Sequence, residues 1–229
     1  DSTPDPAMIE MFNAMVDEMF DYGRFILKEK RKNPSDDLLS AIANAEIEGE
    51  KLTDEFLDGS WLLIIFAGND TTRNTMSGGI KLLHENPKQK ELLMQDTGLL
   101  TNFIHETIRC VSPVIHMRRT SLEETEISGQ RIGPFEKISL WYGAANRDPD
   151  IFENPNEFNI LRENADKHLA FGIGRHTCLG KPIALMQLKE FYSQFLTRFK
   201  DFELNGEWKV APNNFVHAIQ EMPIKFTPE

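Results

Sequence analysis

The stretch FGIGRHTCLG, residues 171–180, places one of the two cysteines of the chain, Cys178, in a loop with three glycines. Three interpretations of this cysteine are open: a buried inert thiol, a zinc ligand together with His176, or a thiol that has a chemical function. A structural zinc ion needs four ligands, which usually include a second closely spaced pair of Cys or His. The sequence contains no such pair. The rest of the chain has to distinguish the inert thiol from the functional one.

The composition is that of a globular protein. A chain of 229 residues with 40% hydrophobic content can bury a core, as one large domain or as part of a larger one. Two cysteines are too few for a disulfide framework, which indicates a reducing compartment, with the cytoplasm as the expected location. The formal charge of -11 argues against nucleic acid as a partner. The longest apolar run, residues 61–68, is far shorter than the ~20 residues that span a bilayer, so we expect no membrane segment.

Helices dominate the expected secondary structure. From apolar periodicity and from Asn, Asp and Pro signals at the ends, helices are expected over residues 6–32, 36–46, 53–86, 87–95, 99–111 and 182–200. Short strands are expected within residues 116–132 and 136–146, joined by a turn that contains glycine, and a strand pair around residues 215–227. The Met-rich stripe of the first helix is assigned to the core. The fold class is therefore mainly α with small β-sheets (α+β).

The longest expected helix contains an unusual polar segment, AGNDTT, at residues 67–72. Poor helix formers follow one another there, and their side chains compete for backbone groups, which should weaken the helical hydrogen bonds. Apolar segments flank the polar one on both sides. We therefore interpret it as a functional site, because a break of local rules in an otherwise consistent element tends to mark one.

The segment HETIR, residues 105–109, carries Glu106 and Arg109 three positions apart, so the two side chains share one helix face and can pair. Such pairs are common on exposed helices, and the order of features is more informative. AGNDTT within a helix is followed by ETIR and then by FGIGRHTCLG before another helix. In this order, over essentially the whole chain, the sequence resembles the cytochrome P-450 monooxygenases. The loop matches the family pattern at Phe171, Gly174, His176, Cys178 and Gly180.

The resemblance implies that Cys178 is the thiolate axial ligand of haem b. The cysteine lies near the start of a helix, where backbone N–H groups favour an anionic sulfur. A thiolate donates electron density to iron and favours O–O cleavage. Phe171, Gly172 and Gly180 would contact the haem, since glycines let the backbone approach it closely. Cys110 matches no functional position of the family and is assigned to the core.

Other residues carry over from the resemblance one at a time. Asp70 and Thr71 match the acid–alcohol pair of oxygen activation, which delivers protons, and Ala67 and Gly68 would leave space for dioxygen beside the haem. Glu106 and Arg109 would form a buried structural brace, with Arg162 as a third member. The residues that would hold the haem propionates are Arg119, His168 and His176. Those that would face the substrate are Leu63, Phe66, Val114, Ile115, Phe215 and Val216.

The implied activity is insertion of one atom of O2 into a hydrophobic substrate such as an alkane, a terpene or a sterol. Electrons would come from NAD(P)H through a ferredoxin or a flavodoxin. One alternative is a peroxide-using or non-redox haem-thiolate enzyme, and another is a haem-based sensor or binding module. Asp70 and Thr71 favour the dioxygen route. The chain is roughly half of a complete member, so residues 1–229 are expected to be the C-terminal haem-binding part of a single domain.

Overall fold

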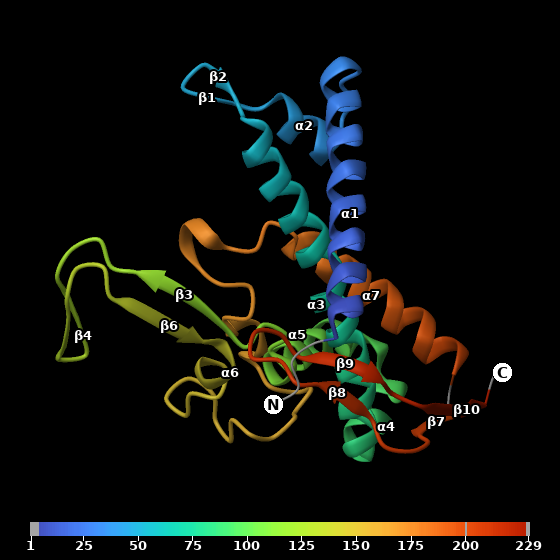
Figure 1. The fold of residues 1–229 in the computed structure, drawn as a ribbon. Helices are drawn as coiled ribbons and strands as arrows, with labels where there is room; N and C mark the ends of the chain where they lie inside the picture. Colours follow the sequence, from blue (N-terminus) through green and yellow to red (C-terminus); the bar gives the residue numbers. More distant parts are fainter. Residues whose placement is uncertain (1–4, 200, 228–229) are drawn as a thin grey trace. The chain divides into compact units, whose positions relative to one another are not determined.

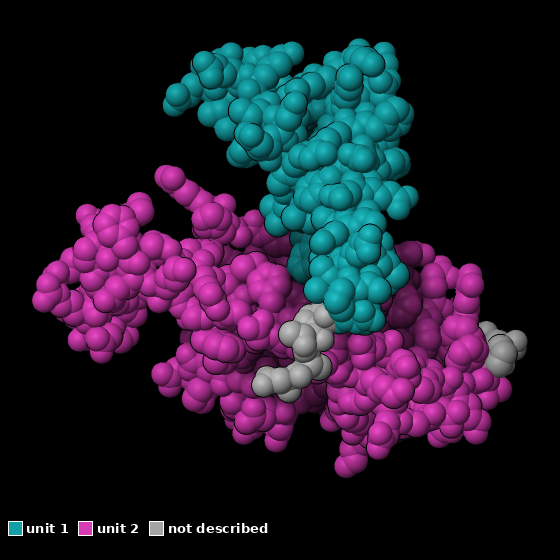
Figure 2. Space-filling view, in the orientation of Figure 1, with its two compact units in different colours: residues 1–69 teal, residues 70–229 magenta. Residues whose placement is uncertain are grey.

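A computed structural model describes residues 5–199 and 201–227. The chain falls into two compact units, residues 1–69 and 70–229, which Figure 2 colours teal and magenta. The boundary between them lies within the longest helix, α3 (Asp54–Glu85). The expected fold class is confirmed, because helices predominate and the strands form small pairs (Figure 1). Among the described helices, none combines the length and the apolar composition needed to cross a bilayer.

The first unit begins with a helix whose start has clear local signals. α1 (Pro6–Lys32) has proline in its first turn, and the Asp5 side chain accepts a hydrogen bond from the Ala7 N–H. It is followed by α2 (Leu38–Asn44), the paired strands β1 (Glu46–Ile47) and β2 (Glu50–Lys51), and the first part of α3. A small core of Leu27, Ala43, Leu57 and Trp61 joins these helices. The Trp61 indole N–H donates to the Met19 carbonyl at 3.0 Å.

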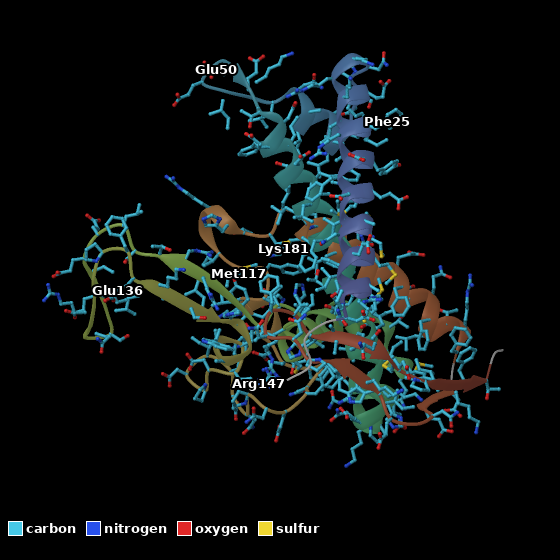
Figure 3. All side chains as sticks on the ribbon, in the orientation of Figure 1. Phe25, Glu50, Met117, Glu136, Arg147 and Lys181 are labelled. Atoms are coloured by element: carbon cyan, nitrogen blue, oxygen red, sulfur yellow. The ribbon has the colours of Figure 1, made fainter. Side chains whose placement is uncertain are left out.

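Most of the Met-rich stripe of α1 lies outside this core, although Phe20 at its end packs against it. Met8 is 61% exposed, and Phe12 and Met15 are exposed to a similar extent. Phe25, further along the helix, is also exposed (Figure 3). The assignment of the stripe to the core is therefore wrong for these exposed residues. Helical periodicity reveals that a face is apolar, but it does not reveal what covers that face.

The second unit packs helices around one apolar core. It contains the second part of α3, together with the whole of α4 (Pro87–Gln95), the 3₁₀ turn η1 (Thr97–Leu99), α5 (Leu100–Val111) and α7 (Lys181–Arg198). Side chains of these helices form a single buried cluster that includes Leu83, Leu93, Phe103, Ile108 and Leu188. Tyr192 of α7 is fully buried, and its hydroxyl donates towards the Thr75 carbonyl of α3 at 2.9 Å. α3 and α7 are thus joined by both packing and a hydrogen bond.

The strands of the second unit form antiparallel pairs. β3 (His116–Thr120) pairs with β6 (Lys137–Trp141), which leads into the short α6 (Tyr142–Ala145), and β4 (Thr125–Ile127) pairs with β5 (Gln130–Ile132). The pair expected within residues 215–227 does not form. Instead, β9 (Ala218–Glu221) pairs with β8 (Lys209–Ala211), and β10 (Ile224–Thr227) pairs with β7 (Asp201–Leu204). Pro223, which has no N–H to donate, separates β9 from β10.

α3 continues without interruption through residues 67–72, so the expected weakening of its hydrogen bonds is not observed. The polar side chains bond to carbonyl groups one turn earlier. The Asn69 amide donates to the Ile65 carbonyl at 3.0 Å, and the Asn74 amide donates to the Asp70 carbonyl at 2.8 Å. These bonds add to the backbone bonds of the helix and do not replace them.

Candidate functional site

The cysteine loop, residues 171–180, leads into the N-terminus of α7 and contains the 3₁₀ turn η3 (Gly174–His176). Its ends are tied together, because the Cys178 N–H donates to the Phe171 carbonyl at 2.8 Å. Gly172 and Gly174 have φ values of +68° and +72°. Residues with a Cβ rarely adopt this region, so the backbone path of the loop requires these two glycines.

The two cysteines have different surroundings. Cys178 is exposed, and a Cβ placed on Gly180, the N-cap of α7, would lie 3.9 Å from its Sγ. The thiol is therefore close to the N-terminus of α7. Cys110 is half-buried, and burial raises its pKa to about 11. Such a thiol stays protonated at neutral pH, which agrees with its assignment to the core.

Exposed apolar side chains lie on the same loop as Cys178 and on the first turns of the helix that follows it. Ile173 and Leu179 of the loop are 76% and 74% exposed, and Ile183 and Met186 in the first turns of α7 are exposed as well. An apolar surface of this kind marks a place that another group covers. One accessible sulfur in an apolar surface fits a flat apolar macrocycle whose metal takes a single thiolate, which is the chemistry of haem.

Two of the side chains predicted to hold the haem propionates can bind the carboxylates of such a macrocycle. Arg119 on β3 donates to the Arg118 carbonyl at 2.8 Å and, within the described part of the chain, forms no ion pair. His176 in the cysteine loop is exposed. Neither side chain has to break an ion pair before it meets an anion, so both suit the predicted role.

His168 lies in a different environment. Its ring is buried, and its Nε2 lies 3.4 Å from Nδ1 of His105 on α5. Its other face packs near Phe171 of the cysteine loop, with 5.6 Å between ring centroids. Among the residues described, none is a hydrogen-bond partner of His168 Nδ1. Burial lowers the pKa of His168 to about 4, so the ring is neutral at pH 7. The ring of His168, a predicted propionate ligand, thus faces His105 on α5.

The Glu–Arg pair forms a buried cluster with the expected third residue. Glu106 accepts hydrogen bonds from Arg109 Nε at 2.7 Å and from Arg162 Nε at 3.1 Å. All three side chains are buried, and they form one ion-paired cluster. Both guanidinium groups also donate to backbone carbonyls between residues 146 and 157. The cluster therefore fixes the irregular segment that precedes the cysteine loop.

Asp70 and Thr71 occupy consecutive positions of α3 at the start of the second unit. The Asp70 carboxylate forms an ion pair with Arg73, one turn further along, at 2.5 Å. The other predicted residues of this helix belong to the first unit, and they are Leu63, Phe66, Ala67 and Gly68. The roles of all six residues stay predictions.

Four residues predicted to face the substrate come together in the second unit. Val114 and Val216 form an antiparallel bridge, and the Ile115 N–H donates to the Phe215 carbonyl at 2.8 Å. The two segments are far apart in the sequence, yet they run side by side before β3 and β9. Their contact with a substrate stays a prediction.

Sequence reasoning did not single out Asn146, which the structure places in the interior. Its side chain accepts from the Leu169 N–H at 2.7 Å and donates to Ser112 Oγ at 2.9 Å, and its carbonyl accepts from Arg109 at 2.8 Å. Asn146 thus connects α5 with the approach to the cysteine loop. It lies at the start of a segment rich in Asn, Asp and Pro, and no local pattern distinguishes it from its neighbours.

Known proteins match this chain over nearly all its length. A family model of cytochrome P450 matches residues 4–227. Cytochrome P450-terp of a Pseudomonas species is 36% identical over 216 residues, which are 94% of this chain and 50% of that protein. The steroid C26-monooxygenase of Mycobacterium tuberculosis (strain CDC 1551) is 38% identical over 211 residues, 91% of this chain and 56% of that protein. The solved structure of cytochrome P450-153 from Novosphingobium aromaticivorans is 35% identical with a TM-score of 0.86, over 97% of this chain and 55% of that one. The chain spans about half the length of these relatives, and it belongs to the cytochrome P450 family.

Proposed function

We propose that the full-length protein is a haem-thiolate monooxygenase that inserts one atom of dioxygen into a hydrophobic substrate. The observation that carries this proposal is the exposed Cys178 thiol, which is close to the N-terminus of α7 and lies on a loop that also exposes the apolar side chains of Ile173 and Leu179. Haem held by a thiolate supplies the chemistry, because the sulfur donates electron density that favours O–O cleavage. Among the predicted alkane, terpene and sterol-like substrates, relatives named linalool 8-monooxygenase and steroid C26-monooxygenase support the terpene and sterol-like ones.

In this proposal the cysteine loop and β3 hold the cofactor. Cys178 Sγ is the ligand, and Arg119 and His176 donate to the carboxylates. The backbone at Gly172 and Gly180 and the ring of Phe171 border the haem, as do Ala67 and Gly68 of α3. The sequence predicted His168 for the same set, but its ring is buried against His105, so the proposal assigns the carboxylates to Arg119 and His176.

Proton movement is assigned to α3. The Asp70 carboxylate takes up a proton from solvent and passes it towards Thr71. The Thr71 hydroxyl donates its hydrogen on the side of α3 where dioxygen would bind. The pair favours the dioxygen route over a peroxide-using or non-redox enzyme.

Electrons would arrive from NAD(P)H through a ferredoxin or a flavodoxin in the cytoplasm. Arg175, Lys181 and Lys189 are exposed on the cysteine loop and α7 (Lys181 is labelled in Figure 3), and Arg198 is exposed at the end of that helix. These cations stand out in a chain of net charge -11. An acidic electron carrier would be steered towards them at low salt.

Reconstitution of the full-length protein with NAD(P)H, a reductase and either carrier tests this proposal. A hydroxylated product that requires O2, together with a spin-state change on titration with alkane, terpene and steroid panels, is expected. Charge reversal at Arg175 and Lys181 should slow reduction in a salt-dependent way. Product formed only with hydrogen peroxide would instead identify a peroxide-using enzyme. Haem binding without substrate-dependent consumption of NAD(P)H would identify a sensor.

A further inference from the structure

The interior of the second unit contains a pair of histidines that the proposed reaction does not use. His105 Nδ1 on α5 and His168 Nε2 are 3.4 Å apart, and the ring centroids are separated by 5.6 Å. Burial lowers the pKa of both rings below the ordinary value of 6.5, for His168 to about 4. Both rings are therefore neutral at pH 7, and they share one hydrogen bond.

This pair connects α5 with the cysteine loop. The His168 ring packs near the Phe171 ring, and the Phe171 carbonyl accepts the Cys178 N–H at 2.8 Å. The next residue, Leu169, is held at its N–H by Asn146 and accepts the Gly172 N–H at its carbonyl. A movement of the His168 ring therefore reaches the backbone of Cys178 through a single intervening residue.

The contact depends on the number of protons that the pair holds. A hydrogen bond between two imidazoles needs an N–H on one facing nitrogen and a lone pair on the other. When both rings are protonated, each facing nitrogen carries hydrogen, so the bond is lost and two cations repel each other in a buried site. Two charged groups act on the pair from neighbouring elements. Asp166 of η2 (Ala165–Lys167) favours protonation, and Lys181 at the start of α7 opposes it.

We propose that His105 is a positioning residue: while one facing nitrogen of the pair keeps its lone pair, it holds His168 against Phe171 and so fixes the backbone of the cysteine loop, and protonation of both rings releases the loop. This inference goes beyond the proposed function, because it concerns neither the substrate nor the reaction. Only one consequence of the inference, the loss of thiolate ligation in acid, rests on the proposed haem-binding role of the cysteine loop.

The direction of the pH dependence follows from the lowered pKa values. In the closed form of the loop His168 packs against Phe171, and in the open form this contact is lost. Because the pair binds protons less readily in the closed form, the closed form is fully stabilised only above about pH 6.5. That stabilisation is lost progressively as the pH falls from about 6.5 towards 4. Because each of the two rings takes up a proton on opening, the equilibrium constant for opening rises up to about a hundredfold per pH unit in this window.

The experiment is native-state hydrogen exchange of the full-length haem-containing protein, read as the protection factor of the Cys178 amide after correction for intrinsic exchange. In the wild type, protection should fall between pH 6.5 and 4 with the slope given above. His105→Leu removes the partner of His168 and should lower protection about tenfold already at pH 7. The double variant His105→Asn, His168→Asn keeps a donor and an acceptor at both positions without a titrating ring. Its protection should stay near the wild-type value at pH 7 and remain flat down to pH 4.

His84→Leu is the matched control, because His84 is exposed on α3 and should leave both protection and its pH slope unchanged. The proposal is overturned if His105→Leu has wild-type protection at pH 7, or if the double variant keeps the wild-type slope. Nitrogen NMR of the imidazoles in the wild-type carbon monoxide complex gives a second test that needs no variant. A proton shared between two neutral rings at pH 7 is expected, and a protonated His105 or His168 at that pH would also overturn the proposal. The thiolate absorption of the same samples tests the proposed function separately, since its absence would refute haem-thiolate ligation without changing the exchange result.

Discussion

Thr71 and Asp70 are the residues on which proton delivery depends in this account. Thr71→Ala should keep haem and substrate binding and continue to consume NAD(P)H, but much of the flux should appear as hydrogen peroxide. Asp70→Asn should lower turnover on the order of 100-fold, because the proton relay loses its titrating group. The ratio of product to NAD(P)H consumed measures both effects. Thr71→Ser retains the hydroxyl and serves as the control, and full coupling in Thr71→Ala would show that the hydroxyl has no such role.

Glu106 balances two buried guanidinium groups, Arg109 and Arg162. Glu106→Gln removes the negative charge with little change of shape and leaves buried cations without a counter-charge. The free energy of unfolding should fall by about 3–5 kcal/mol, as for other broken buried ion pairs. Urea denaturation of the full-length protein measures this loss. Glu203→Gln, which disrupts an exposed ion pair with Lys225, should cost no more than about 1 kcal/mol. Equal losses in the two variants would mean that the buried cluster is not a brace.

Packing between helices is tested by two glycines of α3. A Cβ on Gly79 would lie 2.1 Å from the Tyr192 hydroxyl oxygen, so Gly79→Ala has to displace a buried tyrosine that hydrogen-bonds to α3. We expect a loss of about 1–3 kcal/mol in unfolding free energy. Gly59→Ala adds a Cβ where no atom lies within 4 Å and should stabilise the helix by about 0.5–1 kcal/mol. Stabilisation by both substitutions would show that α3 and α7 are not packed as described.

The helices were predictable because their signals are local. The predicted helix over residues 6–32 has the same limits as α1, since Pro6 and the capping Asp5 define its start. The C-terminal strands were not predictable from local pattern, because β8, β9, β7 and β10 pair with partners that periodicity cannot identify. The prediction that the hydrogen bonds of α3 would be weakened was also wrong, because the side-chain amides donate to carbonyls of the same helix.

The candidate site was predictable to the extent that its motifs are contiguous. The Cys178 loop, Glu106 and Arg109 lie in short patterns with a physical reason for each residue type. Asn146 and His105 were missed, because their roles depend on contacts with residues far away in the sequence. For such residues only the tertiary structure provides the signal.

The protein as a whole is predicted to need more chain than these residues provide. Its relatives are about twice as long, and apolar side chains of α1 and α3, such as Phe12 and Leu63, are exposed. Surfaces of this kind are normally covered in soluble monomers. We therefore expect residues 1–229 expressed alone to aggregate or dimerise and to have no monooxygenase activity. Light scattering and activity assays check this, and a monomeric segment that turns over substrate would refute it.

The central claim is that Cys178, and not Cys110, holds the haem iron of the full-length protein. The absorption spectrum of the reduced carbon monoxide complex tests it most directly, because the band position reports whether the ligand is a thiolate. The wild type and Cys110→Ala should both show the thiolate band, and Cys178→Ala should lose it. An unchanged thiolate band in Cys178→Ala would contradict the account.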